Sequence, residues 1–570
     1  MMAFTRLSGY VRFFHPSDSV VTANWHLFLA NGLRVVESAT TPDSLTRALR
    51  TLFAGVAPTM RIDRVGTPPH SPVPAAAGNA VAFWAHRGVS LATSVYKEQT
   101  LYSSTRVIAA SVAAGQPAST LLGKAFPDPN RPERIDLGAG VAAVMPVALR
   151  VAMPAVPEAR RLAPKTFSSC VSSADDRFTR LAAVAELWMV MEHFYPYWDV
   201  VDTDWWATMR SGLLAASRDK SASDFTVTLQ RMVATLHDGH GGLSHNARPR
   251  PWASYGVVLR VVEGDVMVTR VMDTARTDVR RGDVVLEIDG RPSSTVLAEQ
   301  TSLESSATPQ FAEYLALLNL MWGFPGDTRT VRVRSAESPA APVRTVTLRA
   351  REMTSVRDTP DDLRPEKVAE LAPGVLYVHL GKISDAEFVA LLPRLQRASG
   401  LVFDLRGYPS FDTRLLLPRL SDSTITSARF ELPVRSLPGT DAVTFQNSPW
   451  ILTPIRPRLR AKVAFLTDGR AISYAESTMG IVEAYKLGEI VGEPTAGTNG
   501  NINPFMLPGG FRVTWTGLRV RKHDGSPHHA VGIMPTIPAS ATKRGVLAGR
   551  DEQLEAALAV VRSARRSSGA

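Results

Sequence analysis

The strongest constraint on the fold is a pattern that occurs twice in this chain of 570 residues. A Phe-Thr-Arg-Leu run begins at Phe4 and again at Phe178, and further matches follow at an offset of 180 positions. These matches are His15-Pro16 with Tyr195-Pro196, Asn24-Trp25 with Asp204-Trp205, and Leu49 with Leu229. Self-similarity at a fixed interval is typical of a duplicated structural unit.

Both copies of this pattern have the apolar spacing of helices. Residues 181–193 and 225–236 are examples, and a proline marks the turn after the first helix. The copies differ at their ends, because Met60 in the first stands where His240 stands in the second. We therefore expect a duplicated helical module, with residues 1–72 as a degenerate repeat and residues 178–250 as the repeat that carries chemistry.

The segments that follow each repeat differ from helices in composition. Residues 73–165 contain strand-like apolar runs, which predict a β-rich module without indicating its role, and a polar linker follows at residues 160–177. Residues 254–350 combine short apolar runs with Gly-Asp and Asp-Gly turns, which favours a small β-barrel.

The run Val279-Arg-Arg-Gly-Asp-Val-Val-Leu-Glu-Ile-Asp-Gly-Arg291 resembles the signature of PDZ domains. Such domains bind a peptide as an added strand and hold its carboxylate on backbone amides. The resemblance implies a peptide-binding site at Tyr255, Gly256 and Val257. The alternative is a barrel that acts as an inert spacer.

Residues 366–562 alternate between strand and helix patterns. Apolar runs at 375–380, 401–407 and 462–467 predict buried strands, and the stretches at 386–397 and 475–487 predict helices. This alternation is typical of an α/β core, whose functional sites lie at strand ends.

Ser473 lies in a strand–turn–helix sequence at such a strand end. A serine hydroxyl becomes nucleophilic when a base lies within hydrogen-bond reach, and the amides of a helix start can stabilise an oxyanion. The alternative is that Ser473 only caps the helix. His240, on the glycine-flanked turn Asp238-Gly-His240, is a candidate base. Lys486 lies about three and a half helical turns beyond Ser473 and should not reach it.

Charge and composition argue against several classes of protein. The net charge is +11, from 64 basic and 53 acidic residues, but the arginines are scattered and form no nucleic-acid-binding motif. The single Cys170 excludes a disulfide framework and a multi-cysteine metal site. Prolines and an arginine interrupt the most apolar stretch, 141–156, so we expect no membrane span. We also expect no secretory signal in the chain as written, no metal and no cofactor.

Several short motifs follow one another in an order that resembles the tail-specific (C-terminal processing) serine peptidase family. They are Asp238-Gly-His240, the PDZ-like unit, Asp404-Leu-Arg-Gly407, Ser473-x-x-Glu476, Val491-Gly-Glu-Pro-Thr-Ala-Gly497 and Val531-Gly-Ile-Met-Pro535. The resemblance covers about residues 178–560. It implies a helical module, an inserted PDZ domain, a crotonase-like α/β core, a peptide or protein substrate and a location outside the cytoplasm.

The resemblance also implies roles for particular residues. Bacterial processing peptidases carry a base lysine where this chain has Thr498, whereas the tricorn-type branch uses a histidine that corresponds to His240. Ser473 is then the nucleophile and His240 the general base. The amides of Gly407 and Tyr474 form the oxyanion hole.

The group that orients the base stays open between three residues. The tricorn pattern has a glutamate at or beside the position of His529. His529, Asp238 or Glu476 can therefore hold the imidazole, and we favour His529 as a site member with Glu476 as a supporting carboxylate.

Two other functions fit the same fold. One is a non-catalytic peptide- or ligand-binding protein, as in family relatives that bind retinoids, and the other is a serine esterase. The sequence is compatible with a homo-oligomer.

Overall fold

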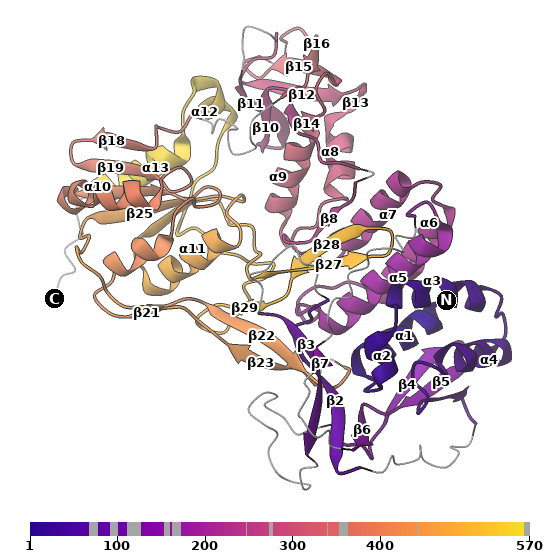
Figure 1. The fold of residues 1–570 in the computed structure, drawn as a ribbon. Coiled ribbons are helices and arrows are strands. Elements are labelled where there is room, and N and C mark those ends of the chain that lie inside the picture. The colour runs from indigo at the N-terminus through magenta and orange to yellow at the C-terminus, as the bar shows by residue number, and fades with distance from the viewer. Residues whose placement is uncertain are drawn as a thin grey trace.

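The computed structural model describes residues 1–67, 78–91, 101–110, 127–152, 160–161, 173–246, 248–272, 277–338, 340–352, 363–439 and 442–563. Helices and several separate sheets make this a mixed α/β protein, as predicted (Figure 1). Cys170 and most of the predicted linker lie outside the described residues. Among the helices of the described residues, none combines the length and apolar character that a bilayer crossing requires.

Two sets of helices stand at one side of the molecule, on the right in Figure 1. The first set is α1 (Met2–Phe14), α2 (Asp18–Thr22), α3 (Trp25–Glu37) and α4 (Pro42–Phe53), and the second is α5 (Arg177–Phe194), α6 (Trp205–Arg218) and α7 (Ala222–Ala234). Asn24 and Asp204 cap α3 and α6 by accepting from the amides of Leu27 and Ala207. Each cap satisfies an amide that has no partner within its helix. Helix α5 is buried along almost its whole length, because α1, α3 and α6 all pack against it.

The strands between these sets belong to two sheets, one of which is shared with the C-terminal part of the chain. They are β1 (Arg61–Arg64), β2 (Ala80–Arg87), β3 (Ser103–Ala110), β4 (Glu133–Gly138), β5 (Val141–Met145), β6 (Ala148–Val151) and β7 (Arg160–Arg161). One sheet has the order β1-β5-β4. Another has the order β23-β22-β2-β3-β7, so it includes β22 (Arg429–Arg435) and β23 (Thr444–Asn447) from the C-terminal part of the chain.

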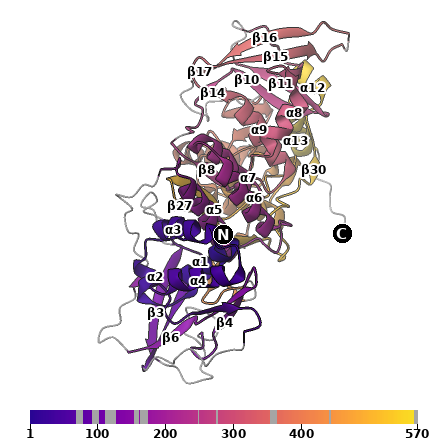
Figure 2. The same cartoon turned by 90° about the vertical axis from the view of Figure 1, so that its right-hand side faces the viewer.

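Residues 253–352 form the unit at the top of Figure 1, and Figure 2 shows it at one end of an elongated molecule. Its main sheet has the order β10-β11-β12-β15-β16, and β10 is an edge strand beside helix α9. The elements are β9 (Ala253–Ser254), β10 (Val257–Val262), β11 (Asp265–Val271), β12 (Asp283–Ile288), β13 (Arg291–Pro292), α8 (Ser293–Thr301), α9 (Pro309–Leu320), β14 (Trp322–Gly323), β15 (Thr328–Ser335), β16 (Arg344–Arg349) and β17 (Arg351–Glu352).

The C-terminal core is built on a six-stranded sheet of order β18-β19-β20-β25-β26-β30. In this sheet the strands β19, β20, β25, β26 and β30 run parallel to one another. The nearly continuous apolar runs of the inner strands suit a sheet that is covered on both faces. The elements are β18 (Val368–Ala372), β19 (Val375–His379), α10 (Asp385–Arg397), β20 (Gly400–Asp404), η3 (Thr413–Leu415), η4 (Leu417–Arg419), β21 (Ile425–Thr426), β24 (Ile451–Leu452), β25 (Lys462–Thr467), α11 (Tyr474–Tyr485), β26 (Glu489–Gly492), β29 (Arg519–Arg521), β30 (Ile537–Pro538), α12 (Lys543–Ala548) and α13 (Glu552–Arg562).

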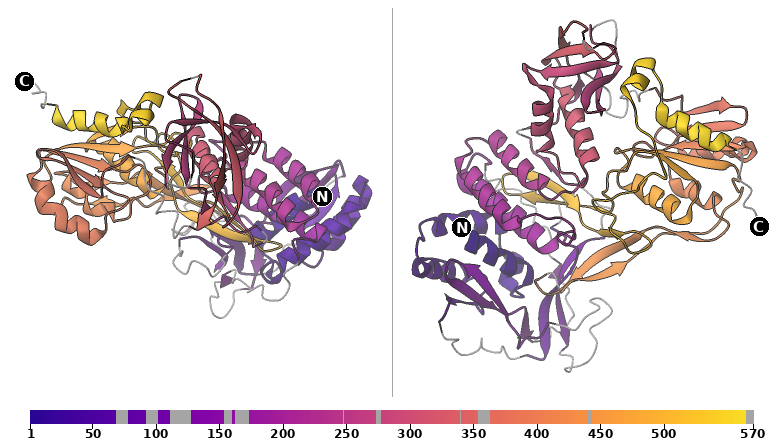
Figure 3. Two further views of the ribbon diagram at one scale, coloured as in Figure 1. Left: turned by 90° about the horizontal axis from the view of Figure 1, so that it is seen from above. Right: turned by 180° about the vertical axis from the view of Figure 1, so that it is seen from behind.

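A β-hairpin connects this core to the second helical set. Strands β27 (Ile502–Leu507) and β28 (Phe511–Thr516) pair with each other, and β28 also pairs with β8 (Gly242–Ser244), which follows α7. Figure 3 shows the hairpin between the helices and the core in the view from behind. The turn before β8 therefore lies against the core.

Candidate functional site

Ser473 occupies a sharp elbow between β25 and α11. Its backbone φ is 60° and its ψ is −113°, a conformation that a serine rarely adopts and that costs of the order of 1–3 kcal/mol. Its amide donates to the carbonyl of Thr498 at 2.9 Å. Ser473 is the N-cap residue of α11, but its side chain makes no capping hydrogen bond.

Thr498 connects the serine elbow to the turn that carries His240. Its hydroxyl accepts from the amide of Gly239 at 2.9 Å, while its carbonyl accepts from the Ser473 amide. A Cβ placed on Gly239 would lie 2.8 Å from the Thr498 hydroxyl and 3.0 Å from Cδ1 of Ile472. The glycine therefore permits a close contact between the Asp238–His240 turn and both neighbours of the elbow.

Two groups in a row, Thr516 and Asp238, hold the imidazole of His240. Its Nδ1 lies 2.9 Å from Oγ1 of Thr516, and that hydroxyl lies 2.6 Å from Oδ1 of Asp238. The buried Asp238 also accepts from the amides of Thr516, at 2.6 Å, and of His240, at 3.0 Å. We call the row Asp238–Thr516–His240 the threonine relay.

The threonine relay fixes where the protons are. A carboxylate accepts hydrogen bonds and does not donate them, so the single hydroxyl proton of Thr516 goes to Asp238. The hydroxyl oxygen then accepts from Nδ1–H of His240. Nε2 is consequently the unprotonated nitrogen of the neutral ring, which is the form that a general base needs.

Burial lowers the pKa of His240, and the carboxylates of Asp238 and Glu476 oppose that effect. The net direction is downward, which keeps the ring neutral at physiological pH.

Glu476 lies on the first turn of α11 and is fully buried. Its carboxylate accepts from the amides of Gly497 at 2.7 Å and Thr498 at 2.9 Å, and from the hydroxyl of Thr495. It therefore holds the loop that presents the Thr498 carbonyl to Ser473.

His529 lies behind the His240 turn. Its Nε2 donates to the carbonyl of His237 at 2.9 Å, and its ring stacks on Tyr197 with centroids 3.9 Å apart. Burial lowers the pKa of His529 to about 4, so the ring is neutral above that pH. These contacts give His529 a place beside the backbone of the turn, whereas Thr516 occupies the position next to Nδ1 of His240.

The two expected oxyanion donors follow the C-terminal ends of two neighbouring strands of the core sheet. Strands β20 and β25 are adjacent and parallel, so Gly407 and Tyr474 follow neighbouring strand ends. Gly407 has φ 130°, and a Cβ there would meet no atom within 4 Å. The loop after it reaches the first residue of α11, because the amide of Thr413 donates to the Tyr474 hydroxyl at 2.9 Å.

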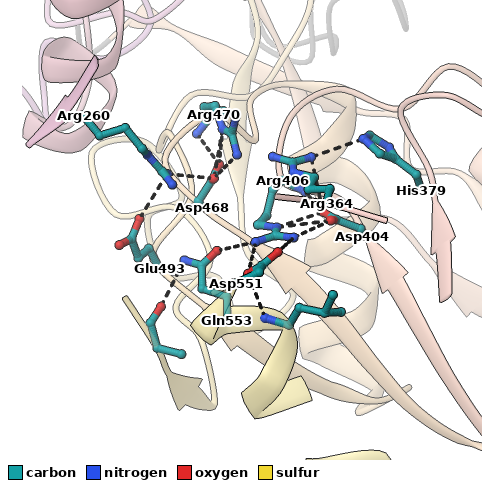
Figure 4. Close-up of polar contacts among 12 residues, drawn as sticks. Arg260, Arg364, His379, Asp404, Arg406, Asp468, Arg470, Glu493, Asp551 and Gln553 are labelled. Atoms are coloured by element: carbon teal, nitrogen blue, oxygen red, sulfur yellow. Dashed lines mark hydrogen bonds and ion pairs between the residues drawn. The ribbon is translucent and has the colours of Figure 1, made fainter. Parts of the chain in front are cut away.

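Ion pairs brace the same strand ends (Figure 4). Arg406 contacts Asp404 at 2.6 Å after β20, and Arg470 contacts Asp468 at 2.6 Å after β25. Burial alone would raise the pKa of Asp468, but the guanidinium groups of Arg470 and Arg260 lower it overall. Arg260 belongs to β10, so the ion pair between Arg260 and Asp468 also connects the unit of residues 253–352 to the serine elbow.

The three residues expected to bind a peptide lie where β10 begins. The amide of Tyr255 donates to the carbonyl of Met321 at 3.1 Å, and the amide of Gly256 donates to the Ser254 hydroxyl at 3.1 Å. Val257 pairs with Val271 of β11. A peptide carboxylate at this place would have to compete with these bonds, and β10 is the edge strand of its sheet.

Thr516 and Thr498 are the site residues that the sequence did not reveal. Thr516 is 276 positions from His240, and a threonine on a strand is too common to attract notice. Thr498 drew attention only as a replacement for lysine. Among the described residues, no group of histidine, cysteine, aspartate and glutamate is arranged to hold a metal ion.

One family model matches part of this chain. Residues 374–539 match the family model of peptidase family S41, and this segment includes Gly407, Ser473 and Glu476. No curated protein sequence matches the chain.

Among solved structures, the chain is similar to mature CPAF, with a TM-score of 0.53 and 15% identity over 67% of this chain and 96% of that one. Mature CPAF complexed with lactacystin gives 0.54 and 14% over 68% and 98%. At this identity the likeness concerns the fold. The photosystem II D1 C-terminal processing protease gives a TM-score of 0.38, with 16% identity over 67% and 97%, which is too low to carry an argument.

Proposed function

We propose that this chain, whose residues 374–539 match the family model of peptidase family S41, is a serine peptidase and a tail-specific endopeptidase of the tricorn type. Its base is then a histidine and not a lysine. The threonine relay is the observation that carries this proposal, because it leaves Nε2 of His240 able to accept a proton. Thr498 bridges the two backbone segments that bear His240 and Ser473.

The proposed reaction begins with acyl transfer to the enzyme. Oγ of Ser473 attacks the carbonyl carbon of the scissile peptide bond while its proton moves to Nε2 of His240. The amides of Tyr474 and Gly407 donate to the oxyanion that forms. Asp238 stabilises the resulting imidazolium through Thr516. The imidazolium then gives its proton to the leaving amine, and the C–N bond breaks.

The second half regenerates the enzyme. His240 takes a proton from a water molecule, which attacks the acyl carbon, and the ester bond to Ser473 breaks as His240 returns the proton to Oγ. Glu476 supports this cycle by holding the 495–498 loop, and His529 supports it by holding the His237 carbonyl.

The finer assignment of the fold belongs to the same proposal. We assign residues 366–562 to a crotonase-like peptidase core, 254–350 to a PDZ-like domain, and 178–250 to the helical module that supplies the base. Residues 1–72 are its degenerate repeat, and residues 73–165 are the β-rich module. The parallel sheet of the core and the edge strand β10 beside α9 support these assignments.

A serine-directed fluorophosphonate tests the proposal. We expect one adduct, located on Ser473 by mass spectrometry, and we expect its formation to slow by about 10²–10⁴-fold in His240→Ala. Folded protein that does not react would favour the non-catalytic binding protein. Labelling with turnover of ester but not peptide reporters would favour the esterase.

A further inference from the structure

The two helical sets agree in their boundaries as well as in their sequence. Helices α1 and α5 end at Phe14 and Phe194, and helices α3 and α6 begin at Trp25 and Trp205. Each of these pairs is separated by the same 180 positions as the sequence repeat. The agreement holds for α1 with α5 and for α3 with α6, whereas α2 has no helical counterpart in the second set.

The correspondence continues into the strands. Strand β1 follows α4 and pairs with β5 of the hairpin β4–β5, whereas β8 follows α7 and pairs with β28 of the hairpin β27–β28. The two hairpins align from Leu137 with Leu507 to Met145 with Trp515, which are 370 positions apart. Away from the turn the pairing register of the two hairpins is the same, since Ile135 lies opposite Ala143 and Phe505 lies opposite Val513. Next to the turn, the first hairpin alone has a bulge.

The next strands correspond as well. Ala82 of β2 lies opposite Leu149 of β6, and Glu431 of β22 lies opposite Arg519 of β29. Leu149 and Arg519 are again 370 positions apart, so β2 and β22 are equivalent strands. Each also pairs with a further strand on its other side, β3 and β23 respectively.

Equivalent strands meet each other in the middle of the large sheet. Strands β2 and β22 pair antiparallel, and His86 lies opposite Arg435. His86 comes four residues after Ala82, and Arg435 comes four residues after Glu431, so these two residues are themselves equivalent. An antiparallel pair in which a position faces its own equivalent marks a two-fold axis.

The helices show the same symmetry around α1 and α5. The equivalent residues Phe14 and Phe194 stack with centroids 6.5 Å apart, and the equivalent Phe13 and His193 lie 5.8 Å apart. The crossed pairs are reciprocal, because Phe13 contacts Phe194 at 4.9 Å and Phe14 contacts His193 at 5.2 Å. Reciprocal contacts of this kind define an isologous interface.

The helix contacts and the strand contacts share one axis. The His86 ring lies 5.7 Å from the Phe14 ring, and the Arg435 guanidinium lies 5.6 Å from the Phe194 ring, which is the reciprocal contact. The two symmetric patches therefore form one continuous surface.

We propose that residues 1–151, which we call the internal partner, are a truncated second copy of part of the catalytic unit, residues 178–562. The copied part comprises the helices α5 to α7, the hairpin β27–β28 and the strands β22 and β29. The internal partner occupies, within one chain, the surface by which the catalytic unit would pair with another copy of itself. The protein is then a single-chain pseudo-dimer with one active site. The inferred pairing rests on the sequence repeat, the contacts and the pairing register, and it does not depend on the proposed reaction.

The internal partner lacks the groups that the catalytic unit uses. Pro146 stands at the position of Thr516, 370 positions away. Ile62 lies opposite Ala143 and Leu243 lies opposite Val513, an offset of 181, so Thr59 and not Met60 stands at the place of His240. A hollow of about 390 Å³ lined by Phe53, Met60 and Ile62 lies at this end of α4. In the catalytic unit the corresponding face is covered by the core, and the internal partner has no core of its own to cover it.

The mass of the protein before and after cleavage tests the proposal. A specific protease site inserted within residues 162–172 of the full chain allows the internal partner to be severed after folding. Sedimentation should give the one-chain mass of 61.8 kDa before cleavage and the same mass, with both fragments in one particle, afterwards. A two-chain mass before cleavage would overturn the proposal, because the pairing surface would then not be occupied within the chain.

Gly9→Leu tests whether α1 and α5 form this interface. A Cβ at Gly9 would lie 2.9 Å from Nε2 of His193 and 3.2 Å from Cγ of Met189, so the substitution forces the helices apart. Gly55→Leu is the matched control, since a Cβ there meets nothing within 4 Å. After cleavage, the fragments of Gly9→Leu should dissociate at least tenfold more readily than those of Gly55→Leu.

The larger fragment released from Gly9→Leu should pair with a second copy of itself when it also carries Arg435→His, which gives position 435 the residue found at its equivalent, His86, and avoids two arginines facing each other on the axis. A released fragment that stays a monomer overturns the proposal, because the exposed surface would not be self-complementary. Equal retention in the two glycine variants overturns it as well. If Gly9→Leu does not fold, Phe14→Ala supplies the same comparison without adding atoms.

Discussion

Replacing Thr516 with valine removes one hydroxyl and nothing else from the site. In Thr516→Val, Asp238 keeps its bonds from the amides of residues 516 and 240, but Nδ1 of His240 loses its acceptor. The imidazolium that forms during the reaction is then separated from the Asp238 carboxylate by a methyl group. The variant should fold, because the two side chains have nearly the same shape.

The size of the loss follows from the type of bond. A hydrogen bond to a charged group contributes about 1.5–3 kcal/mol, and here the full amount develops when His240 becomes charged in the transition state. Since about 1.4 kcal/mol is tenfold in rate, we expect kcat to fall roughly 10- to 150-fold with KM little changed.

Thr514→Val is the matched control on the same strand. Its hydroxyl donates to the carbonyl of His240 at 2.9 Å, so it contacts the same residue without touching the ring. We expect kcat within about twofold of the parent. Steady-state kinetics on a peptide reporter, with melting temperatures for both variants, makes the comparison. Equal losses in the two variants, or full activity in Thr516→Val, would refute the relay.

Three further predictions concern pH and the oxyanion loop. Because burial lowers the pKa of His240, kcat/KM should rise with pH through a single ionisation below about 6.5, and a midpoint near 9 or above would contradict a histidine base. Gly407→Ala should lower kcat by about 10²-fold or more, since alanine is strained at φ 130°. Gly290→Ala is the control, because Gly290 has φ 76° and a Cβ there also meets no atom within 4 Å, and it should leave kcat unchanged. Burial lowers the pKa of His86 and of His529 to about 4, so the unfolded state binds more protons than the folded state between about pH 4 and 6.5. The free energy of unfolding should therefore fall as the pH falls through that window. Equal free energies of unfolding at pH 5 and pH 7, measured by urea denaturation, would contradict this.

The local elements of the core were predictable because short-range patterns encode them. The apolar runs at 401–407 and 462–467 correspond to β20 (Gly400–Asp404) and β25 (Lys462–Thr467), and the helix predicted at 475–487 is α11 (Tyr474–Tyr485). The serine elbow between β25 and α11 was predictable for the same reason. Periodicity and turn residues lie within a few positions of each other, so one sequence is enough to detect them.

The groups that complete the site were not predictable in the same way. The threonine relay requires that β28 lie beside the His240 turn, and this pairing joins segments more than 250 positions apart. Residues 73–165 were predicted to form a β-rich module, and the pairing of its strand β2 with β22 from the C-terminal part of the chain was not predicted. Pairing between distant strands depends on the tertiary fold, and hydrophobic patterning of either strand alone does not specify its neighbour.

The His86–Arg435 pair has a consequence for how such a protein can change over time. In a dimer of identical chains, every substitution on the axis faces itself, so an arginine there would meet a second arginine inside a buried sheet. Here the two positions are encoded separately, and the neutral His86 accommodates the buried Arg435. Fusion of the two copies thus removes the constraint of self-compatibility from the central positions. One half can become a scaffold while the other keeps its catalytic groups.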